Sequence, residues 1–376
     1  MTAPAIVELG EVAAFVRGIT FKPDDVVPVG TPDTAACMRT KNVQAELDLS
    51  DVWGIPEAFV RREDQYLIPG DTLVSSANSW NLVGKCCWVP DLPWRSTFGG
   101  FISVLRPNSS KVDPRYLFRW FASDRTQATV RSFGQQTTNI SNLNVDRCLK
   151  LKLRLPPLPE QRRIAEILDK ADALRVKRGA ALAELDTLTQ SIFLDMFGDP
   201  ATNPKGWPVR TFDETMRDET SRAEKLQRSD YLPEGRYPVV DQGQSVIAGY
   251  CDDDRYLCPS ELPVVVFGDH TRAVKLVRHR FVVGADGAKV LAPEPGVDVV
   301  FLSYLMRELP IPDLGYSRHM REVKRLAFPI PPIARQQEFA RRVSGIEMHR
   351  ESHDRSRLAL DSFFASLQHR AFRGEL

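Results

Sequence analysis

The chain has 376 residues, of which 43% are hydrophobic and 26% are charged, and its formal net charge is +1. Such a length exceeds one ordinary hydrophobic core and the composition is that of a folded protein, so we expect two or more domains and exclude wholesale disorder. The charge balance excludes a bulk polycation. It leaves room for a local basic face, such as the arginine-rich stretch 321–342.

Residues 1–154 mix short apolar runs with glycine and proline. Strands are predicted at 6–10, at 73–75 after the turn 69–71, and at 99–105. A helix is predicted at 113–121, because Asp113 is a good N-cap and apolar residues recur at helical spacing after it. This order indicates a first domain of mixed α+β type.

A long helix is predicted next, and it occurs twice. Residues 155–197 and 330–372 correspond without a gap, and each copy opens with a Pro-Pro pair that cannot lie inside a helix. Each helix would be ~55 Å long at 1.5 Å per residue. Both copies place apolar residues at heptad-like spacing, and these are Ile164, Leu168, Ala171, Leu182, Leu185, Ile192 and Met196 in the first and Phe339, Val343, Ile346, Leu360, Phe364 and Leu367 in the second.

The two helices are expected to pair with each other in an antiparallel coiled coil, the alternative being that each packs on its own domain. Both seams become polar in the middle, at Arg175 and Arg178 and at Arg350, His353 and Arg357. Because these cations would repel one another, compensation is expected from another subunit or from acidic residues, for which the candidates are Glu184, Glu351 and Asp354.

Residues 199–329 repeat the plan of the first domain. A buried strand is predicted at 262–269, a glycine-strand unit at 283–291 and a helix at 298–306 that matches 113–121. The predicted fold is therefore α+β. It contains two similar globular domains, 1–154 and 199–329, separated by the helices 155–198 and 330–376 in a pseudo-two-fold repeat.

Several motifs in this order resemble the specificity subunit of type I restriction–modification systems. They are the two Pro-Pro-x-x-x-Gln helix starts, Met196-Phe197-Gly198-Asp199-Pro200 leading to Gly206-Trp207, and the terminal Ala371-Phe372-Arg373-Gly374-Glu375-Leu376. Within the domains, the segments 9–12, 70–74, 135–140, 241–243, 267–271 and 315–319 are also typical. One departure is Ala334-Arg335-Gln336, where the family prefers the Pro-Glu-Gln found at 159–161.

The resemblance implies a non-catalytic subunit in which two target-recognition domains each read half of a bipartite site in double-stranded DNA. It also implies that the paired helices set the spacing and dock two modification (methyltransferase) subunits, with restriction (translocase/nuclease) subunits completing a phage-defence complex. No cofactor is expected in this chain, and S-adenosylmethionine is expected in the modification subunits. Two alternatives stay open: the detached recognition part of a single-chain restriction–methylation enzyme, and a coiled-coil protein adaptor.

Catalytic chemistry is missing from the sequence. Neither Pro-Pro pair lies in the Asp/Asn-Pro-Pro-aromatic motif of adenine methyltransferases, and there is no P-loop. The nuclease-like pattern of Asp313, Glu322 and Lys324 has no counterpart in the first domain, and His349 and His353 lack a third ligand, so no metal site is predicted. Six cysteines without zinc spacing, and no apolar run long enough for a membrane, predict a cytoplasmic protein in a reducing compartment.

Polar loops after predicted strands fit base recognition better. Asn and Gln pair bidentately with adenine, threonine methyls contact thymine, and Arg reads guanine. The DNA-binding candidates are Ser75, Ser76, Asn78, Trp80, Asn81, Gln135, Gln136, Thr137, Thr138 and Asn139 in the first domain, and Gln242, Gln244, His270, Thr271, Arg272, Tyr316, Arg318 and His319 in the second.

Overall fold

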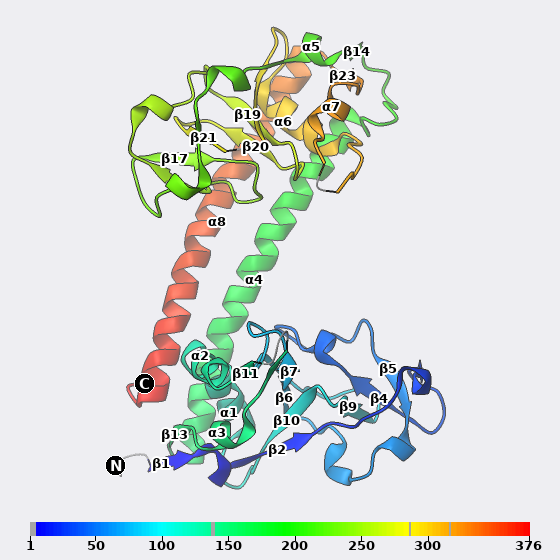
Figure 1. Ribbon diagram of the computed structural model, residues 1–376, viewed down its shortest axis with the longest axis vertical. Helices are drawn as coiled ribbons and strands as arrows, with labels where there is room; N and C mark the ends of the chain where they lie inside the picture. The colour runs from blue at the N-terminus through cyan, green and yellow to red at the C-terminus, as the bar shows by residue number, and fades with distance from the viewer. Residues whose placement is uncertain (1–4, 137–139, 286, 316) are drawn as a thin grey trace. The chain divides into compact units, whose positions relative to one another are not determined.

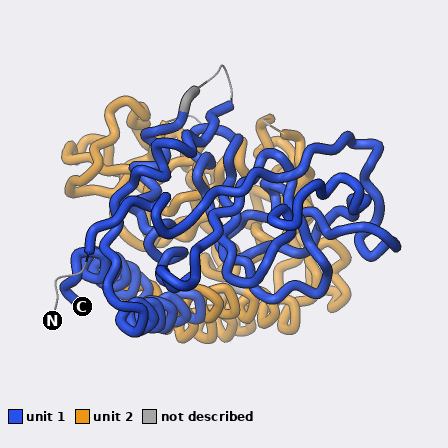
Figure 2. Tube along the Cα trace, turned by 90° about the horizontal axis from the view of Figure 1, so that it is seen from below, with its two compact units in different colours: residues 1–177, 357–376 blue, residues 178–356 orange. Residues whose placement is uncertain are grey.

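The computed structural model describes residues 5–136, 140–285, 287–315 and 317–376. The chain divides into two compact units (Figure 2). Unit 1 holds residues 1–177 and 357–376, and unit 2 holds residues 178–356. Each unit combines a globular α+β part with segments of two long helices, α4 (Leu158–Phe197) and α8 (Ile333–Arg373).

The globular part of unit 1 contains two four-stranded sheets (Figure 1). The first is antiparallel, in the order β2 (Ala13–Arg17), β10 (Ile102–Pro107), β6 (Thr72–Ser75) and β8 (Cys86–Trp88). The second has the order β3 (Val27–Pro28), β5 (Trp53–Pro56), β4 (Thr34–Met38) and β9 (Ser96–Phe98), with β4 and β9 parallel. Short ladders join β1 (Ala5–Glu8) to β13 (Lys152–Leu155), and β7 (Ala77–Asn78) through β12 (Ser141–Asn142) to β11 (Gln135–Gln136).

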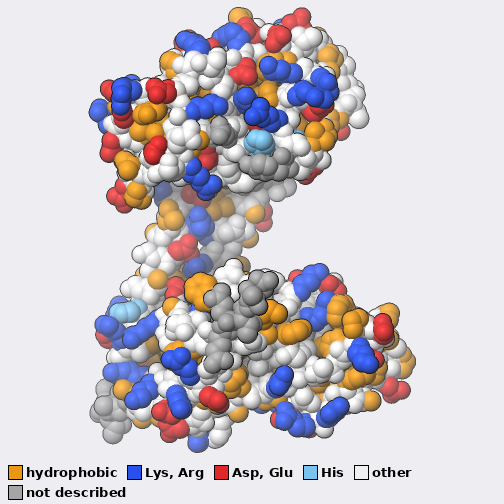
Figure 3. Space-filling view, in the orientation of Figure 1, with side chains coloured by type: hydrophobic (Ala, Val, Ile, Leu, Met, Phe, Trp, Pro, Cys, Tyr) orange, Lys and Arg blue, Asp and Glu red, His pale blue; other side chains and the backbone are white. Residues whose placement is uncertain are grey.

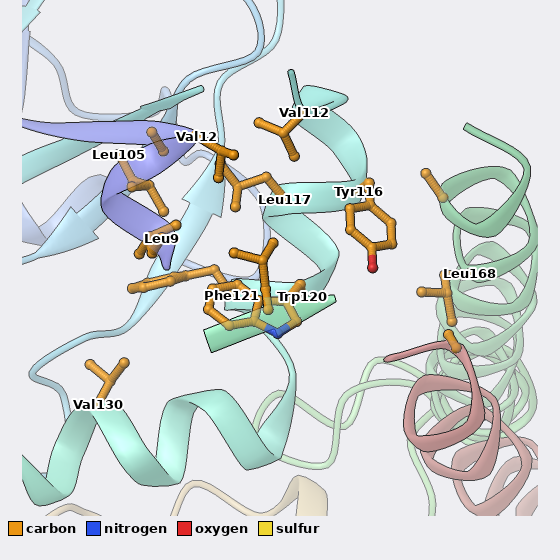
Figure 4. Packing of buried hydrophobic residues seen from close by; sticks show 14 of the residues in the cluster. Leu9, Val12, Leu105, Val112, Tyr116, Leu117, Trp120, Phe121, Val130 and Leu168 are labelled. Atoms are coloured by element: carbon orange, nitrogen blue, oxygen red, sulfur yellow. The ribbon is translucent and has the colours of Figure 1, made fainter. Parts of the chain in front are cut away.

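The main core of unit 1 lies between the first sheet, its helices and the first part of α4 (Figure 4). Helix α1 (Pro114–Phe121) begins at the predicted N-cap, where the carboxylate of Asp113 accepts from the backbone N–H groups of Arg115 and Tyr116. Helices α2 (Asp124–Ser132) and α3 (Val145–Leu149) complete this layer. Side chains from distant parts of the chain meet here, and the figure labels Leu9, Val12, Leu105, Val112, Tyr116, Leu117, Trp120, Phe121, Val130 and Leu168.

Unit 2 repeats the topology of the first sheet. Its antiparallel sheet has the order β15 (Met216–Asp218), β22 (Ala288–Pro293), β19 (Val264–Gly268) and β20 (Val274–Val277), so β19 occupies the position of β6. The other sheet is β16 (Lys225–Leu226), β21 (Val282–Gly284), β17 (Tyr237–Val240) and β18 (Gly249–Cys251). The short ladder β14 (Val209–Arg210) with β23 (Phe328–Pro329) corresponds to β1 with β13. Helices α5 (Phe212–Thr215), α6 (Val299–Glu308) and α7 (Met320–Val323) complete the unit.

The repeated glutamine of each helix start is buried and ties the helix to its globular part. Gln161 accepts from the backbone N–H of Asp113 at 2.7 Å and donates to the Pro156 carbonyl at 2.7 Å. Gln336 accepts from the N–H of Asp298 at 2.8 Å and donates to the Pro331 carbonyl at 2.7 Å. Asp113 and Asp298 are the N-caps of α1 and α6. The side-chain amide of each glutamine therefore joins the start of a long helix to the start of a shorter one, α4 to α1 in unit 1 and α8 to α6 in unit 2.

Within each unit, the segments of α4 and α8 run antiparallel. In unit 2, Phe193 stacks edge-on against Phe339, with ring centroids 5.5 Å apart, and Arg178 meets His353, with nitrogens 3.1 Å apart. The apolar seam differs from the predicted one in the second part of α4. Phe193 and Phe197 are buried there, whereas the predicted Ile192 and Met196 are only half-buried, because the Phe193 and Phe197 rings also fill the space against Phe301 of α6.

The polar middle of the helices is neutralised differently from the prediction. In unit 1, Arg175 forms ion pairs with Asp172 at 3.1 Å and with Asp361 at 2.7 Å. Arg357 also faces Asp361, at 3.6 Å. Of the predicted acids, only Asp354 has a described ion pair with a seam cation, Arg350 at 3.9 Å. The prediction is thus confirmed for Asp354, but it missed Asp172 and Asp361, which flank the seam centre.

Candidate nucleic-acid interface

In unit 1 the fold brings the two predicted reading loops together. The loop 75–81 follows β6 and contains β7, and β12 pairs with β7 on one side and with β11 on the other. Leu143 N–H donates to the Ser76 carbonyl at 2.8 Å and extends this contact. The backbone of Gln135 and Gln136 forms β11, whereas Thr137, Thr138 and Asn139 lie outside the described residues.

The candidates of the 75–81 loop differ in exposure. The indole of Trp80 is 54% exposed, and Asn81 is exposed and accepts from the Ser79 hydroxyl at 2.7 Å. Ser76 and Asn78 are half-buried at the base of the loop. Ser75 is buried, and its hydroxyl accepts from the Asn78 amide at 3.2 Å. Direct contact with DNA is therefore open to Trp80 and Asn81, and Ser75 shapes the loop from below.

In unit 2 the corresponding loop, 268–272, follows β19. His270 Nδ1 lies 3.2 Å from the Ser317 carbonyl, so this loop is joined to the second predicted reading segment, 315–319. Arg272 has a left-handed backbone (φ 58°), and its guanidinium binds the Ile311 carbonyl at 3.1 Å and the Asp313 carboxylate at 2.7 Å. Arg318 is exposed, and Tyr316 lies outside the described residues.

His319 is buried and joins the two segments. Its Nδ1 lies 2.8 Å from the carbonyl oxygen of Asp269, which can only accept, so Nδ1 carries the proton. Nε2 then accepts from the Leu314 N–H at 3.3 Å. The buried Asp269 carboxylate accepts from the Met320 N–H at 2.6 Å. With both ring nitrogens engaged, the imidazole supports the loop and does not project from it.

Gln242 and Gln244 belong to a third segment that packs on the 268–272 loop. The Gln242 carbonyl accepts from the Thr271 hydroxyl, and the Gln244 amide donates to the Thr271 carbonyl at 3.5 Å. The side-chain oxygen of Gln242 is buried and has no hydrogen-bond partner among the described residues. Gln244 is exposed. The structure thus brings all described candidates of unit 2 to three adjoining segments.

Buried ion pairs hold the strands that carry these loops. Arg106 of β10 binds the fully buried Asp71, just before β6, through two contacts of 2.6 and 2.8 Å. Hydrogen bonding to Asp71 raises the pKa of this guanidinium. In unit 2, Lys275 of β20 donates to the Asp241 carbonyl at 2.7 Å. Burial lowers the pKa of this ammonium, and the nearby Asp241 carboxylate opposes that shift.

The nuclease-like pattern does not form a site. Asp313 pairs with Arg272, and Glu322 pairs with Arg321 and Arg325. No group of three or more His, Cys, Asp or Glu side chains suited to a metal ion occurs among the described residues. Within the same part of the chain, no helix is long and apolar enough to cross a membrane. On the visible face of each unit, Lys and Arg side chains are interspersed with acidic ones (Figure 3).

Comparison with known proteins shows which proteins this chain resembles. Residues 5–185 match the model of the type I restriction modification DNA specificity domain family. The fold resembles the type I restriction–modification S subunit of M. genitalium, with a TM-score of 0.58 at 13% identity over 98% of this chain and 96% of that one. A second structure, described as showing complex assembly and conformational transition of the type I R-M system, has a TM-score of 0.56 at 16% identity, over 100% of this chain and 99% of that one.

Sequence relatives agree. The chain is 22% identical to the putative type I restriction enzyme MjaX specificity subunit of Methanocaldococcus jannaschii, over 90% of this chain and 86% of the relative. It is 29% identical to the EcoKI specificity subunit of Escherichia coli K12, over 44% of this chain and 35% of that one. The first half of the chain thus matches the DNA specificity domain family, and most of the chain is similar to a type I specificity subunit.

Proposed function

We propose that this chain is a type I specificity subunit, which reads a bipartite site in double-stranded DNA through two target-recognition domains, 1–154 and 199–329. The observation that carries the proposal is the equivalence of the reading loops: 75–81 follows β6 and 268–272 follows β19, which are the same strand of equivalent sheets. One loop offers Asn81 and Trp80, and the other offers His270 and Arg272. Because equal positions carry different chemistry, the two half-sites differ in sequence.

Base recognition then depends on a few exposed side chains. Asn81 suits adenine and Arg318 suits guanine, each through two hydrogen bonds in the major groove. The flat indole of Trp80 suits apolar contact with a base or its sugar. Ser75 and His319 act indirectly, since their side chains are buried and hold the loops. Neighbouring Lys and Arg side chains bind phosphate and set the register without reading sequence.

The helices 155–198 and 330–376 are proposed to pair as an antiparallel coiled coil along their whole length and to fix the number of unspecified bases between the half-sites. They also form the docking surface for two modification subunits, which bind S-adenosylmethionine, and through them for restriction subunits. Antiparallel contacts within each unit, such as Phe193 with Phe339 and Arg175 with Asp361, support this pairing.

The test is methylome sequencing of a host that expresses this chain with its modification subunits. Trp80→Ala is expected to change recognition of one half-site only, and Arg318→Ala that of the other only, each variant being the control for the other. Losing one bidentate contact costs about 1–3 kcal/mol of discrimination at one base pair. The proposal is rejected if either variant methylates the original bipartite sequence at an unchanged rate.

Spacing is tested separately by inserting one heptad into both helices, after Ala181 and after Arg350. These points face each other by the contact of Arg178 with His353, so both seams stay in register. Seven residues add ~10 Å of helix, equivalent to about three base pairs. Both half-sites are expected to persist with about three more unspecified bases between them. Unchanged spacing with full activity would show that the helices do not set it.

A further inference from the structure

A groove in unit 1 lies outside every segment assigned above. Its volume is about 510 Å³, and it is lined by residues at and after the end of β2, by residues 39–41 after β4, by Trp53 of β5 and by the connection between β9 and β10. Three cations line it, and Asp51 beside the groove forms ion pairs with two of them, Arg39 and Lys41. The members that matter for the argument are Arg17, Arg39, Lys41, Trp53 and Phe101.

Aromatic side chains form part of the groove wall. The Arg39 guanidinium stacks over the Trp53 ring, 3.5 Å from its centroid, and is held there by the Asp51 carboxylate at 2.9 Å. The phenyl ring of Phe101 is 65% exposed. Its backbone is nevertheless fixed, because the Phe101 carbonyl accepts from the N–H groups of Ser76 at 2.9 Å and Ala77 at 3.2 Å.

These bonds make the groove continuous with the 75–81 loop. A second cavity, of about 370 Å³, is lined by Ser76 and Ala77 of that loop together with Asn142, and Arg17 and Phe101 line both cavities. The aromatic ring thus stands between the loop and the cationic groove. A ligand bound by the loop and carrying phosphates would meet Phe101 first and the cations next.

We infer that Phe101 and Arg17 extend the DNA contact of the first domain beyond its reading loop. The ring of Phe101 packs against a base step that flanks the bases read by the 75–81 loop, and Arg17 binds a phosphate at the mouth of the groove. Exposed aromatic rings are suited to contact with base steps of a duplex, and arginines to its phosphates. The inference rests on the proposed function and adds residues that determine the extent of one half-site.

The sequence of unit 2 has no counterpart of Phe101 at the equivalent position. The corresponding connection, between β21 and β22, is Ala285-Asp286-Gly287 and contains no aromatic residue. A Cβ atom added at Gly287 would lie 2.2 Å from the side-chain oxygen of Gln242, so that position cannot hold a larger residue without a shift. We therefore expect the extended contact at one half-site only.

The experiment measures the binding of the assembled complex, with its modification subunits, to a duplex that carries the sequence found by methylome sequencing. Phe101→Ala is expected to weaken binding about tenfold, through the lost burial of the ring, and to shorten the footprint at one half-site. Phe101→Trp, which keeps an aromatic ring, should keep the affinity and the footprint of the unaltered complex. Ile68→Ala is the matched control, because Ile68 is a 49% exposed apolar residue of the same domain outside both cavities.

Arg17 is tested through salt dependence. Arg17→Ala should lower the slope of log affinity against log salt concentration by about one, whereas Lys150→Ala, an exposed cation outside both cavities, should leave it unchanged. The inference is overturned if Phe101→Ala binds as tightly as Ile68→Ala, or if Phe101→Trp binds as weakly as Phe101→Ala. It is also overturned if Arg17→Ala keeps the full salt slope. Failure of the unaltered complex to bind the bipartite duplex selectively would instead reject the proposed function.

Discussion

Replacing the repeated glutamine of each long helix should destabilise one unit at a time. Gln161 is 1% exposed and Gln336 is fully buried. In Gln161→Ala, the Asp113 N–H and the Pro156 carbonyl lose bonds of 2.7 Å each. A buried backbone group left without a partner costs about 1–3 kcal/mol, so two such groups predict a loss of about 2–4 kcal/mol once partial access of water is allowed for. Gln336→Ala predicts a similar loss in unit 2.

Hydrogen exchange measures this effect locally. A single unfolding free energy is poorly defined for a chain of two units, whereas the amide protons of Asp113 and Asp298 report each site directly. A loss of about 2–4 kcal/mol lowers protection by roughly 30- to 1000-fold. Gln161→Ala should affect the Asp113 amide and its neighbours while leaving the Asp298 amide protected, and Gln336→Ala should do the reverse.

Two further variants separate hydrogen bonding from packing. Gln161→Met keeps most of the side-chain volume without the amide, and it should expose Asp113 to exchange nearly as much as Gln161→Ala does. Gln337→Ala alters an exposed glutamine next to Gln336 and should change neither amide. The reasoning is refuted if Gln161→Met retains native protection at Asp113, because the amide bonds would then contribute nothing to the junction.

Three other outcomes are expected. Arg106→Ala should cost about 3–5 kcal/mol, measured by hydrogen exchange of the β6 and β10 amides, because it leaves the buried Asp71 carboxylate without its partner, and native protection would contradict this. Burial raises the pKa values of Cys37, Cys87 and Cys148 to about 12, so a thiol reagent at pH 8 should modify them only after unfolding. Rapid labelling of the native chain would rule that out. The purified chain with S-adenosylmethionine and DNA should transfer no methyl groups, and transfer above background would end its assignment as non-catalytic.

The repeated part of the fold was predictable because local signals specify it. Proline pairs start the long helices and the side chains of Asp113 and Asp298 cap the shorter ones, so α1, α4, α6 and α8 appear close to the predicted residues. Strands β6 and β10 also lie where turn residues and apolar runs indicated them. These features depend on neighbours in sequence, which one sequence displays directly.

Side-chain environments depend on distant partners and were predicted less well. Ser75 and His319 have the polar character of base-reading residues, yet the packing of other segments buries both. Phe101 has the character of a core residue in a strand, yet it lies at the turn that precedes β10 and is exposed. Nothing within a few residues of these positions signals the difference, because burial is set by which loops meet in space.

The same contrast explains why the repeat alone does not reveal the DNA sequence recognised. Gln161 and Gln336 make the same bonds in both units because they hold the same junction, so the scaffold tolerates little change there. The loops after β6 and β19 share backbone bonds at their bases, where the Ser76 and Asp269 N–H groups donate to the Phe101 and Gly287 carbonyls. Their side-chain bonds differ. Asn78 bonds to Ser75, whereas His270 and Arg272 bond to segments far along the chain. Each loop can therefore change its base-reading side chains without disturbing the glutamine junction. Recognition varies in these side chains while the repeated scaffold stays the same.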